Sequence, residues 1–150
     1  MRPVLCLAIL VLTTPPAFAS TPFDSVARQI GPLCATAPAT SCFDAAFTAV
    51  DADGDGHLDL GEVQRAEAAF RTWTSANWEA LPTADRTGIA LGLLVLDGVG
   101  LEALFRSYDA DGDGRLTPAE LQADIDLDER PLPELVAEGD AVDWAGVARR

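Results

Sequence analysis

Carboxylate side chains recur at alternate positions in two short stretches of this 150-residue chain, from Asp51 to Glu62 and from Asp109 to Glu120. Nine of the 24 acidic residues lie in these stretches, although a merely solubilising acidic surface would spread them along the chain. Alternate residues of a tightly curled loop point inward, and their oxygens suit a hard divalent cation with about six to eight oxygen ligands. Gly56 and Gly114, at the sixth place of each stretch, permit the positive φ that such a curl needs.

The two acidic stretches belong to a longer internal repeat, in which residues 43–63 match residues 101–121 at an offset of 58. Apolar residues before each stretch follow i, i+3, i+4, i+7 spacing, which is one face of a helix. They are Phe43, Ala46, Phe47 and Val50 in the first copy, and Leu101, Leu104, Phe105 and Tyr108 in the second.

Helices are also predicted after each acidic stretch. Thr117 with Glu120, and Asp59 with Glu62, are spaced to cap a helix start. Apolar positions then continue in both copies, at Val63, Ala66 and Phe70 and at Leu121 and Ile125. Each copy is therefore predicted to be a helix, a loop and a second helix.

Both loops resemble the twelve-residue calcium loop of the EF-hand family, D-x-[DN]-x-[DN]-G-x5-E. The resemblance implies an all-α fold and two bound Ca²⁺ ions. A bidentate closing Glu favours Ca²⁺ over Mg²⁺, which requires a tight octahedron. The implied ligands in the first loop are Asp51, Asp53, Asp55, the backbone carbonyl of His57, Asp59 directly or through water, and both oxygens of Glu62; those in the second are Asp109, Asp111, Asp113, the carbonyl of Arg115, Thr117 through water, and Glu120.

Leu58 and Leu116 stand at the eighth loop position, where EF hands form a short antiparallel pairing between two loops. Two pairings are open. In the first, the two intact loops pair with each other and the middle helices are looped out. In the second, each intact loop pairs with an eroded hand downstream, Leu58 with Ile89 in residues 85–91 and Leu116 with Val142 in residues 141–144.

Three segments outside the loops complete the predicted fold. Residues 62–81 are predicted to be helical as far as Pro82, and the almost wholly apolar residues 89–96 to form a buried helix. The triplet Asp124, Asp126 and Asp128 alternates like a ligand series, but Glu129 stands where a turn glycine is required and Leu135 where the closing Glu should be. A solvated helix end is predicted for the triplet instead.

The first 19 residues are predicted to be a signal peptide, with Arg2, an apolar run from Pro3 to Leu12, and Ala17-Phe18-Ala19 before the cleavage point. Residues 20–41 are predicted to hold a short helix that stops at Gly31 and a loop from Pro32 to Thr40, with Ser41 as the next cap. In an oxidising compartment Cys34 and Cys42 are expected to form a disulfide, with two free buried thiols as the alternative. Residues 42–150 then form the EF-hand domain.

Composition narrows the class of partner. The chain has 10 basic residues, none of them Lys, and a net charge of −14 at pH 7, which disfavours nucleic acid and anionic membranes. The N-terminal apolar run is shorter than the roughly 20 residues of a membrane span, and the apolar run at residues 89–96 is also too short, so no span is expected after signal cleavage. His57 is the single His, so a hydrolase triad lacks a partner and no enzyme is expected.

The expected function is calcium binding by an exported protein, periplasmic or secreted, in which calcium stabilises a surface for an envelope or extracellular protein. The second hypothesis is a purely structural or buffering calcium binder, and the third is an enzyme with structural calcium. The short leader and the all-Arg basic set favour a bacterial origin. After residue 19 the chain contains no Met, which disfavours the Met-rich groove of a calmodulin-like sensor.

Overall fold

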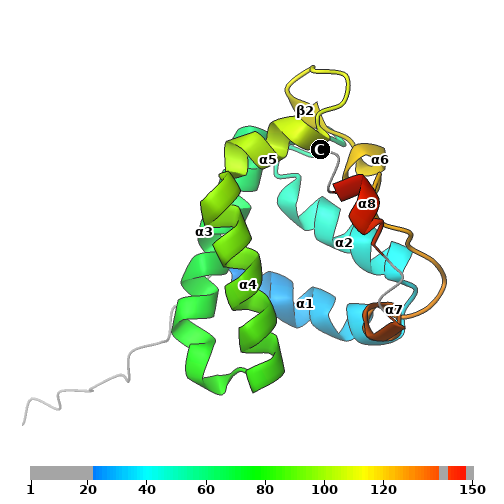
Figure 1. Cartoon of the computed structure of the whole chain (residues 1–150). Coiled ribbons are helices and arrows are strands. Elements are labelled where there is room, and N and C mark those ends of the chain that lie inside the picture. The colour runs from blue at the N-terminus through cyan, green and yellow to red at the C-terminus, as the bar shows by residue number, and fades with distance from the viewer. Residues whose placement is uncertain (1–21, 139–141, 148–150) are drawn as a thin grey trace, which may run out of the picture.

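The computed structural model describes residues 22–138 and 142–147. Helices make up most of it (Figure 1), and the one sheet among the described residues has two short strands. The all-α class predicted from the sequence is therefore confirmed. In chain order the elements are α1 (Pro22–Thr36), α2 (Ala39–Val50), β1 (Leu58–Asp59), α3 (Leu60–Asn77), the 3₁₀ helix η1 (Trp78–Ala80), α4 (Thr83–Val99), α5 (Leu101–Tyr108), β2 (Arg115–Leu116), α6 (Pro118–Leu121), α7 (Leu132–Glu138) and α8 (Trp144–Val147).

The two acidic loops pair with each other through β1 and β2, which run antiparallel with Leu58 opposite Leu116 and Asp59 opposite Arg115. The first hand is α2, loop and α3, and the second is α5, loop and α6. The first of the two predicted pairings is therefore confirmed. The rival scheme, with Leu58 on Ile89 and Leu116 on Val142, is wrong, because Val142 forms its bridge with Ile125.

The main core lies beneath the paired loops and takes two residues from each hand. Phe47, Leu58, Phe105 and Leu116 are all buried and in contact. The apolar faces predicted for α2 and α5 supply the two phenylalanines, whereas Ala46 and Leu104, which occupy equivalent places in the repeat, are exposed. Each hand thus covers the apolar residues of the other, which is why neither is expected to fold alone.

The middle segment is helical on both sides of a break, as predicted. α3 gives way to η1 at Trp78, and Pro82 immediately precedes α4. At the other end of α4, Gly100 has a φ of 88°, and α4 and α5 are bent there by 86°. No single described helix is long and apolar enough to cross a membrane, although the bent pair Asp85–Val99 and Leu101–Tyr108 passes that test together.

The prediction that residues 89–96 form a buried helix is correct for the helix and wrong for its burial. Leu91, Leu94 and Val95 are exposed to 58%, 67% and 60%. Only the side of α4 that carries Ile89, Leu93 and Leu96 is partly covered. A helix that is apolar on all sides is usually enclosed by its own chain, but the described residues cover only one side of α4.

The second exit helix is much shorter than predicted. α6 ends at Leu121, and the chain then turns so that Ile125 bridges Val142 and the backbone N–H of Asp143 donates to the carbonyl of Asp124 (2.8 Å). Asp residues at alternate positions are poor helix formers, which allows this turn. The solvated helix end predicted for the Asp triplet is therefore wrong: Asp124 is buried, and Asp128 pairs with Arg130 (2.7 Å).

The N-terminal helix runs past its predicted stop. α1 continues through Gly31 and Pro32 to Thr36, and Ser41 lies inside α2 rather than capping it. A helix-interior Gly costs about 1 kcal/mol and a helix-interior Pro about 3 kcal/mol, so packing has to offset both costs. Phe23 supplies some of that packing, because its ring lies 5.5 Å from that of Phe70 and 5.3 Å from that of Trp73. The predicted signal peptide lies outside the described residues.

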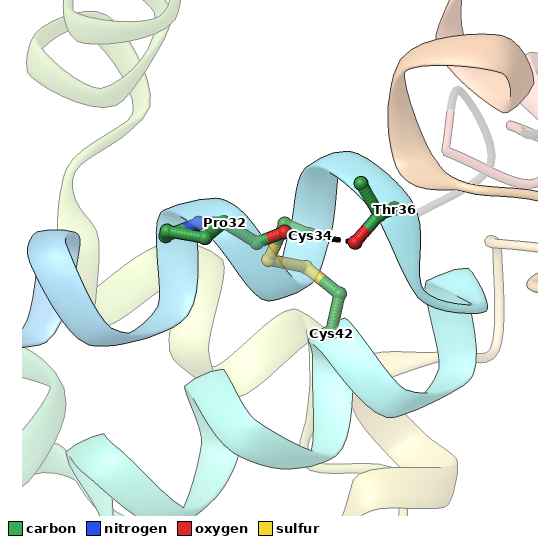
Figure 2. The surroundings of a disulfide bond; sticks show 4 residues. All are labelled: Pro32, Cys34, Thr36 and Cys42. Carbon is green, nitrogen blue, oxygen red and sulfur yellow. Dashed lines mark hydrogen bonds between the residues drawn. A yellow bond between two sulfur atoms is a disulfide. The ribbon is translucent and has the colours of Figure 1, made fainter.

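The predicted disulfide between Cys34 and Cys42 is present and joins α1 to α2 (Figure 2). The Cα atoms of the two cysteines are 4.7 Å apart. Cys42 is buried, and Thr36 Oγ1 donates to the carbonyl of Pro32 (3.1 Å) in the last turn of α1. The bridge therefore fastens the N-terminal helix to the helix that leads into the first acidic loop.

Replacing both cysteines, Cys34→Ser with Cys42→Ser, should lower the free energy of unfolding by about 2 kcal/mol, because the short loop that the bridge closes restricts the unfolded chain. Urea unfolding of the oxidised protein and of the variant measures this difference. Reductant should lower the stability of the unmodified protein and leave the variant unchanged. Equal midpoints for the two oxidised samples would show that the bridge contributes nothing to stability.

Candidate metal centre

Glycines with positive φ shape both acidic loops. Gly56 and Gly114 each have a φ of 81°, which confirms the conformation predicted for the sixth loop position. Gly54 and Gly112, at the fourth position, also have positive φ, of 72° and 74°. Sequence reasoning missed this second pair, although the Asp-Gly-Asp-Gly run that both loops share could have indicated it.

The first aspartate of each loop organises the turn by accepting backbone hydrogen bonds. Asp51 accepts from Gly54 through Oδ1 (2.8 Å) and from Gly56 through Oδ2 (2.9 Å). Asp109 accepts from Asp113 through Oδ1 (3.1 Å) and from Gly114 through Oδ2 (3.0 Å). The loop backbone thus curls around this carboxylate and turns the following side chains toward it.

Carboxylate oxygens converge in both loops, but the two groups differ in membership. In the first loop Asp51, Asp53 and Asp55 each offer an oxygen within 4.8 Å of the others. In the second loop the group is Asp109, Asp111 and Glu120. Glu62 lies outside the first group and Asp113 outside the second, so each loop gathers a different part of the ligand set that the sequence predicts.

The closing glutamates are held by capping boxes at the starts of α3 and α6, as predicted. Glu62 accepts from the N–H of Asp59 (3.0 Å) and, through its other oxygen, from the N–H of Ala52 at the start of the loop (2.7 Å). Glu120 makes the equivalent bonds to Thr117 (2.8 Å) and Ala110 (2.9 Å). Each glutamate therefore ties the end of its loop to the beginning.

These hydrogen bonds favour the ionised form of the second closing glutamate. The backbone N–H of Thr117, then that of Ala110 and the Thr117 hydroxyl, lower the pKa of Glu120, and burial opposes them only weakly. The residue is thus kept in the charged state that a cation would bind.

The remaining predicted ligands occupy the rim of the loops. Asp59 and Thr117 cap α3 and α6 through their side chains. The His57 ring is partly exposed, and its Nδ1 lies 3.1 Å from the carbonyl of Asp55 and 3.7 Å from Oδ1 of the same residue. The ligand roles assigned to the carbonyls of His57 and Arg115 stay predictions.

The donor set fits calcium. It consists of carboxylate oxygens on two exposed loops, with only Asp and Glu in the two converging groups, and such oxygens suit a hard cation. Several acidic residues elsewhere contact arginines instead: Glu67 and Asp97 both contact Arg71, and Glu79 lies 4.0 Å from Arg86. In the part of the chain that the structure describes, the groups of side chains that could hold a metal ion are those of these two loops.

Comparison with known proteins supports the same two segments. The family model of the EF hand matches residues 43–66 and 101–126. The probable calcium-binding protein CML16 of rice, Oryza sativa subsp. japonica, is 38% identical over 114 residues, which are 63% of this chain and 62% of the rice protein. The chain thus spans less than two thirds of the length of that relative. No solved structure matches the chain.

Proposed function

We propose that this chain, whose two helix-loop-helix segments are EF hands, binds two calcium ions, one in each loop. The observation that carries the proposal is the geometry of the paired loops. Each loop gathers three carboxylate oxygens within 4.8 Å of one another, and the β1–β2 pairing holds the loops side by side. When bound, each ion would neutralise charges that otherwise repel one another, so calcium stabilises the fold.

The ligands in this proposal come from both ends of each loop. The three aspartates at positions one, three and five supply oxygens from the loop, and the closing glutamate supplies oxygens from the first turn of the exit helix. In the first loop these residues are Asp51, Asp53, Asp55 and Glu62, and in the second Asp109, Asp111, Asp113 and Glu120. The remaining donors are the carbonyls of His57 and Arg115, with Asp59 and Thr117 acting directly or through water.

We further propose that the protein binds a partner, rather than acting only as a calcium store. An open apolar cavity of about 470 Å³ lies between the hands, and its walls include Phe23, Val63, Phe70, Leu96, Leu104 and Leu121. Leu104 is exposed there at 36%. A cavity of this size, largely apolar and close to both exit helices, suits an apolar segment of an envelope or extracellular protein.

Export to the periplasm or the cell exterior is the location that we propose. Disulfides persist in oxidising compartments and are rare in the cytosol, and Cys34 is bonded to Cys42 in the structure. The composition of residues 1–19 is the second support. Protein purified from an oxidising compartment should therefore begin at residue 20 and contain no free thiol, which mass spectrometry can measure.

Calorimetry tests the proposed function directly. Calcium added to the purified protein should give heat that corresponds to two ions per chain, because each loop is a separate site. Asp51→Ala with Asp109→Ala should abolish uptake, since these aspartates both organise the loops and supply oxygens. The matched control is Asp85→Ala with Asp126→Ala, which removes the same charge from exposed acids outside the loops. Uptake that persists in the first variant would contradict the proposal.

A dye that fluoresces on apolar surfaces distinguishes a partner-binding role from a purely structural or buffering role. Calcium should change dye binding if the ion adjusts the cavity for a partner. Unchanged dye fluorescence across the calcium titration would favour a purely structural or buffering role.

A further inference from the structure

One basic side chain reaches from the second loop into the carboxylate group of the first. Arg115 lies at the seventh position of the second loop, and its Nη1 donates to Oδ2 of Asp55 at 2.5 Å. The two residues are 60 positions apart in the chain. The strand register brings them together, because Arg115 stands opposite Asp59 across the β1–β2 pair. Arg115 is also the one Lys or Arg residue within either twelve-residue loop.

Asp55 has both carboxylate oxygens engaged by protein donors. Its Oδ1 accepts from the backbone N–H of His57 (2.9 Å), and its Oδ2 accepts from Arg115. Asp113, the equivalent residue of the second loop, accepts from the backbone N–H of Arg115 through Oδ1 (2.8 Å). No basic side chain among the described residues pairs with Asp113. The two loops therefore differ in how accessible the carboxylate at the fifth loop position is to an ion.

The asymmetry follows from the residue at the seventh position. In the first loop this residue is His57, whose ring stays beside its own Asp55 at 3.7 Å. In the second loop it is Arg115, whose longer side chain and fixed positive charge cross to the opposite loop. The two loops share the acids at positions one, three, five and twelve, and they differ at the seventh position as well as at the ninth, tenth and eleventh.

We propose that Arg115 competes with calcium for the Asp55 carboxylate and thereby sets a lower affinity for the first loop. This inference rests on the proposed function. The guanidinium holds an oxygen that the first site needs, and its positive charge repels an ion placed there. The same residue would supply its backbone carbonyl to the second ion, so its side chain and its backbone act on different sites.

The size of the effect follows from the exposure of the pair. The side chains of Arg115 and Asp55 are 51% and 34% exposed, and solvent screens an ion pair of this kind. Releasing Asp55 should therefore raise the affinity of the first loop by about two- to fivefold, and not by orders of magnitude.

The test is Arg115→Gln, measured in two backgrounds that each leave one loop competent to bind. Glu120→Gln disables the second loop and Glu62→Gln disables the first. With the second loop disabled, calorimetry should show calcium binding about two- to fivefold tighter when Arg115→Gln is added. The matched control is Arg106→Gln, which removes the same charge from α5, where Arg106 is 71% exposed and pairs with Glu102. The control should change affinity by less than about 1.5-fold.

Thermal unfolding in chelator gives a second readout that needs no bound ion. Arg115→Gln should lower the melting temperature more than Arg106→Gln does, because the ion pair between Arg115 and Asp55 is lost. Asp55 then repels its neighbouring carboxylates with no positive charge beside it. Equal melting temperatures would show that the contact stabilises nothing.

Equal calcium affinities of Arg115→Gln and Arg106→Gln with the second loop disabled would overturn the inference. So would an Arg115→Gln effect of the same size with the first loop disabled, because that effect would be general electrostatics. If the unmodified protein binds two calcium ions and either of these results is obtained, only the role of Arg115 is rejected. Absence of calcium uptake by the unmodified protein rejects the proposed function and this inference together.

Discussion

Glu62→Gln should weaken calcium binding at the first loop by at least about 100-fold, because replacing even an outer-shell partner of a metal costs about 10- to 100-fold and Glu62 is proposed as a direct ligand. Gln keeps a side-chain oxygen that can cap α3, so the helix start is preserved while the negative charge and one oxygen are lost. Calorimetry should then report one ion per chain instead of two.

The matched control for Glu62→Gln is Glu79→Gln, which makes the same chemical change at a side chain that is 94% exposed beside Arg86. This control should retain two sites with unchanged affinity. Far-ultraviolet circular dichroism should show equal helix content for both variants. A Glu62→Gln protein that still binds two ions at the original affinity would remove Glu62 from the ligand set.

The acidic loops could be predicted from the sequence because their structure is local. The carboxylates at alternate positions, the glycines at the sixth position and the glutamates that begin the exit helices all lie within twelve residues. Gly56 and Gly114 have the expected positive φ, and Glu62 and Glu120 form the expected capping boxes. The family model matches the same two segments. Here local propensity, capping and charge all favour one conformation.

The choice of loop partner was open in the sequence because apolar side chains were available for both schemes. Leu116 could face Leu58 or Val142, and hydrophobicity does not distinguish the two. The structure pairs Leu116 with Leu58 and places Val142 on Ile125. Long-range pairing depends on how the intervening chain turns, and the early end of α6 at Leu121 was not apparent from the apolar spacing.

The feature least predictable from the sequence was which apolar helix faces are covered by other elements. Residues 89–96 contain almost only apolar side chains, which normally indicates burial, yet Leu94 is 67% exposed. Periodicity reveals which residues share a face but not whether another element lies over it. The same limit applies to Leu104, which matches Ala46 in the repeat and lines the apolar cavity, although it is exposed. The extension of α1 through Pro32 depends likewise on tertiary packing.

Leu116→Ala should lower the free energy of unfolding by about 3 kcal/mol, because truncating a buried Leu loses apolar burial and leaves a cavity. Leu116 is 3% exposed and lies in the core with Phe47, Leu58 and Phe105. It also pairs with Leu58 in the sheet, so the loss affects both hands at once. Urea unfolding in saturating calcium and in chelator measures the change, and calcium affinity should fall at both loops.

Leu94→Ala is the control, since Leu94 is 67% exposed and its truncation should change stability by less than about 0.5 kcal/mol. A sharper test combines Leu58→Ala with Leu116→Ala. If each Leu stabilises its hand by contact with the other, the double variant should lose less than the sum of the single losses, by about 1 kcal/mol. Strict additivity would mean that the hands are stabilised independently, and the sheet pairing could not then link the two calcium sites.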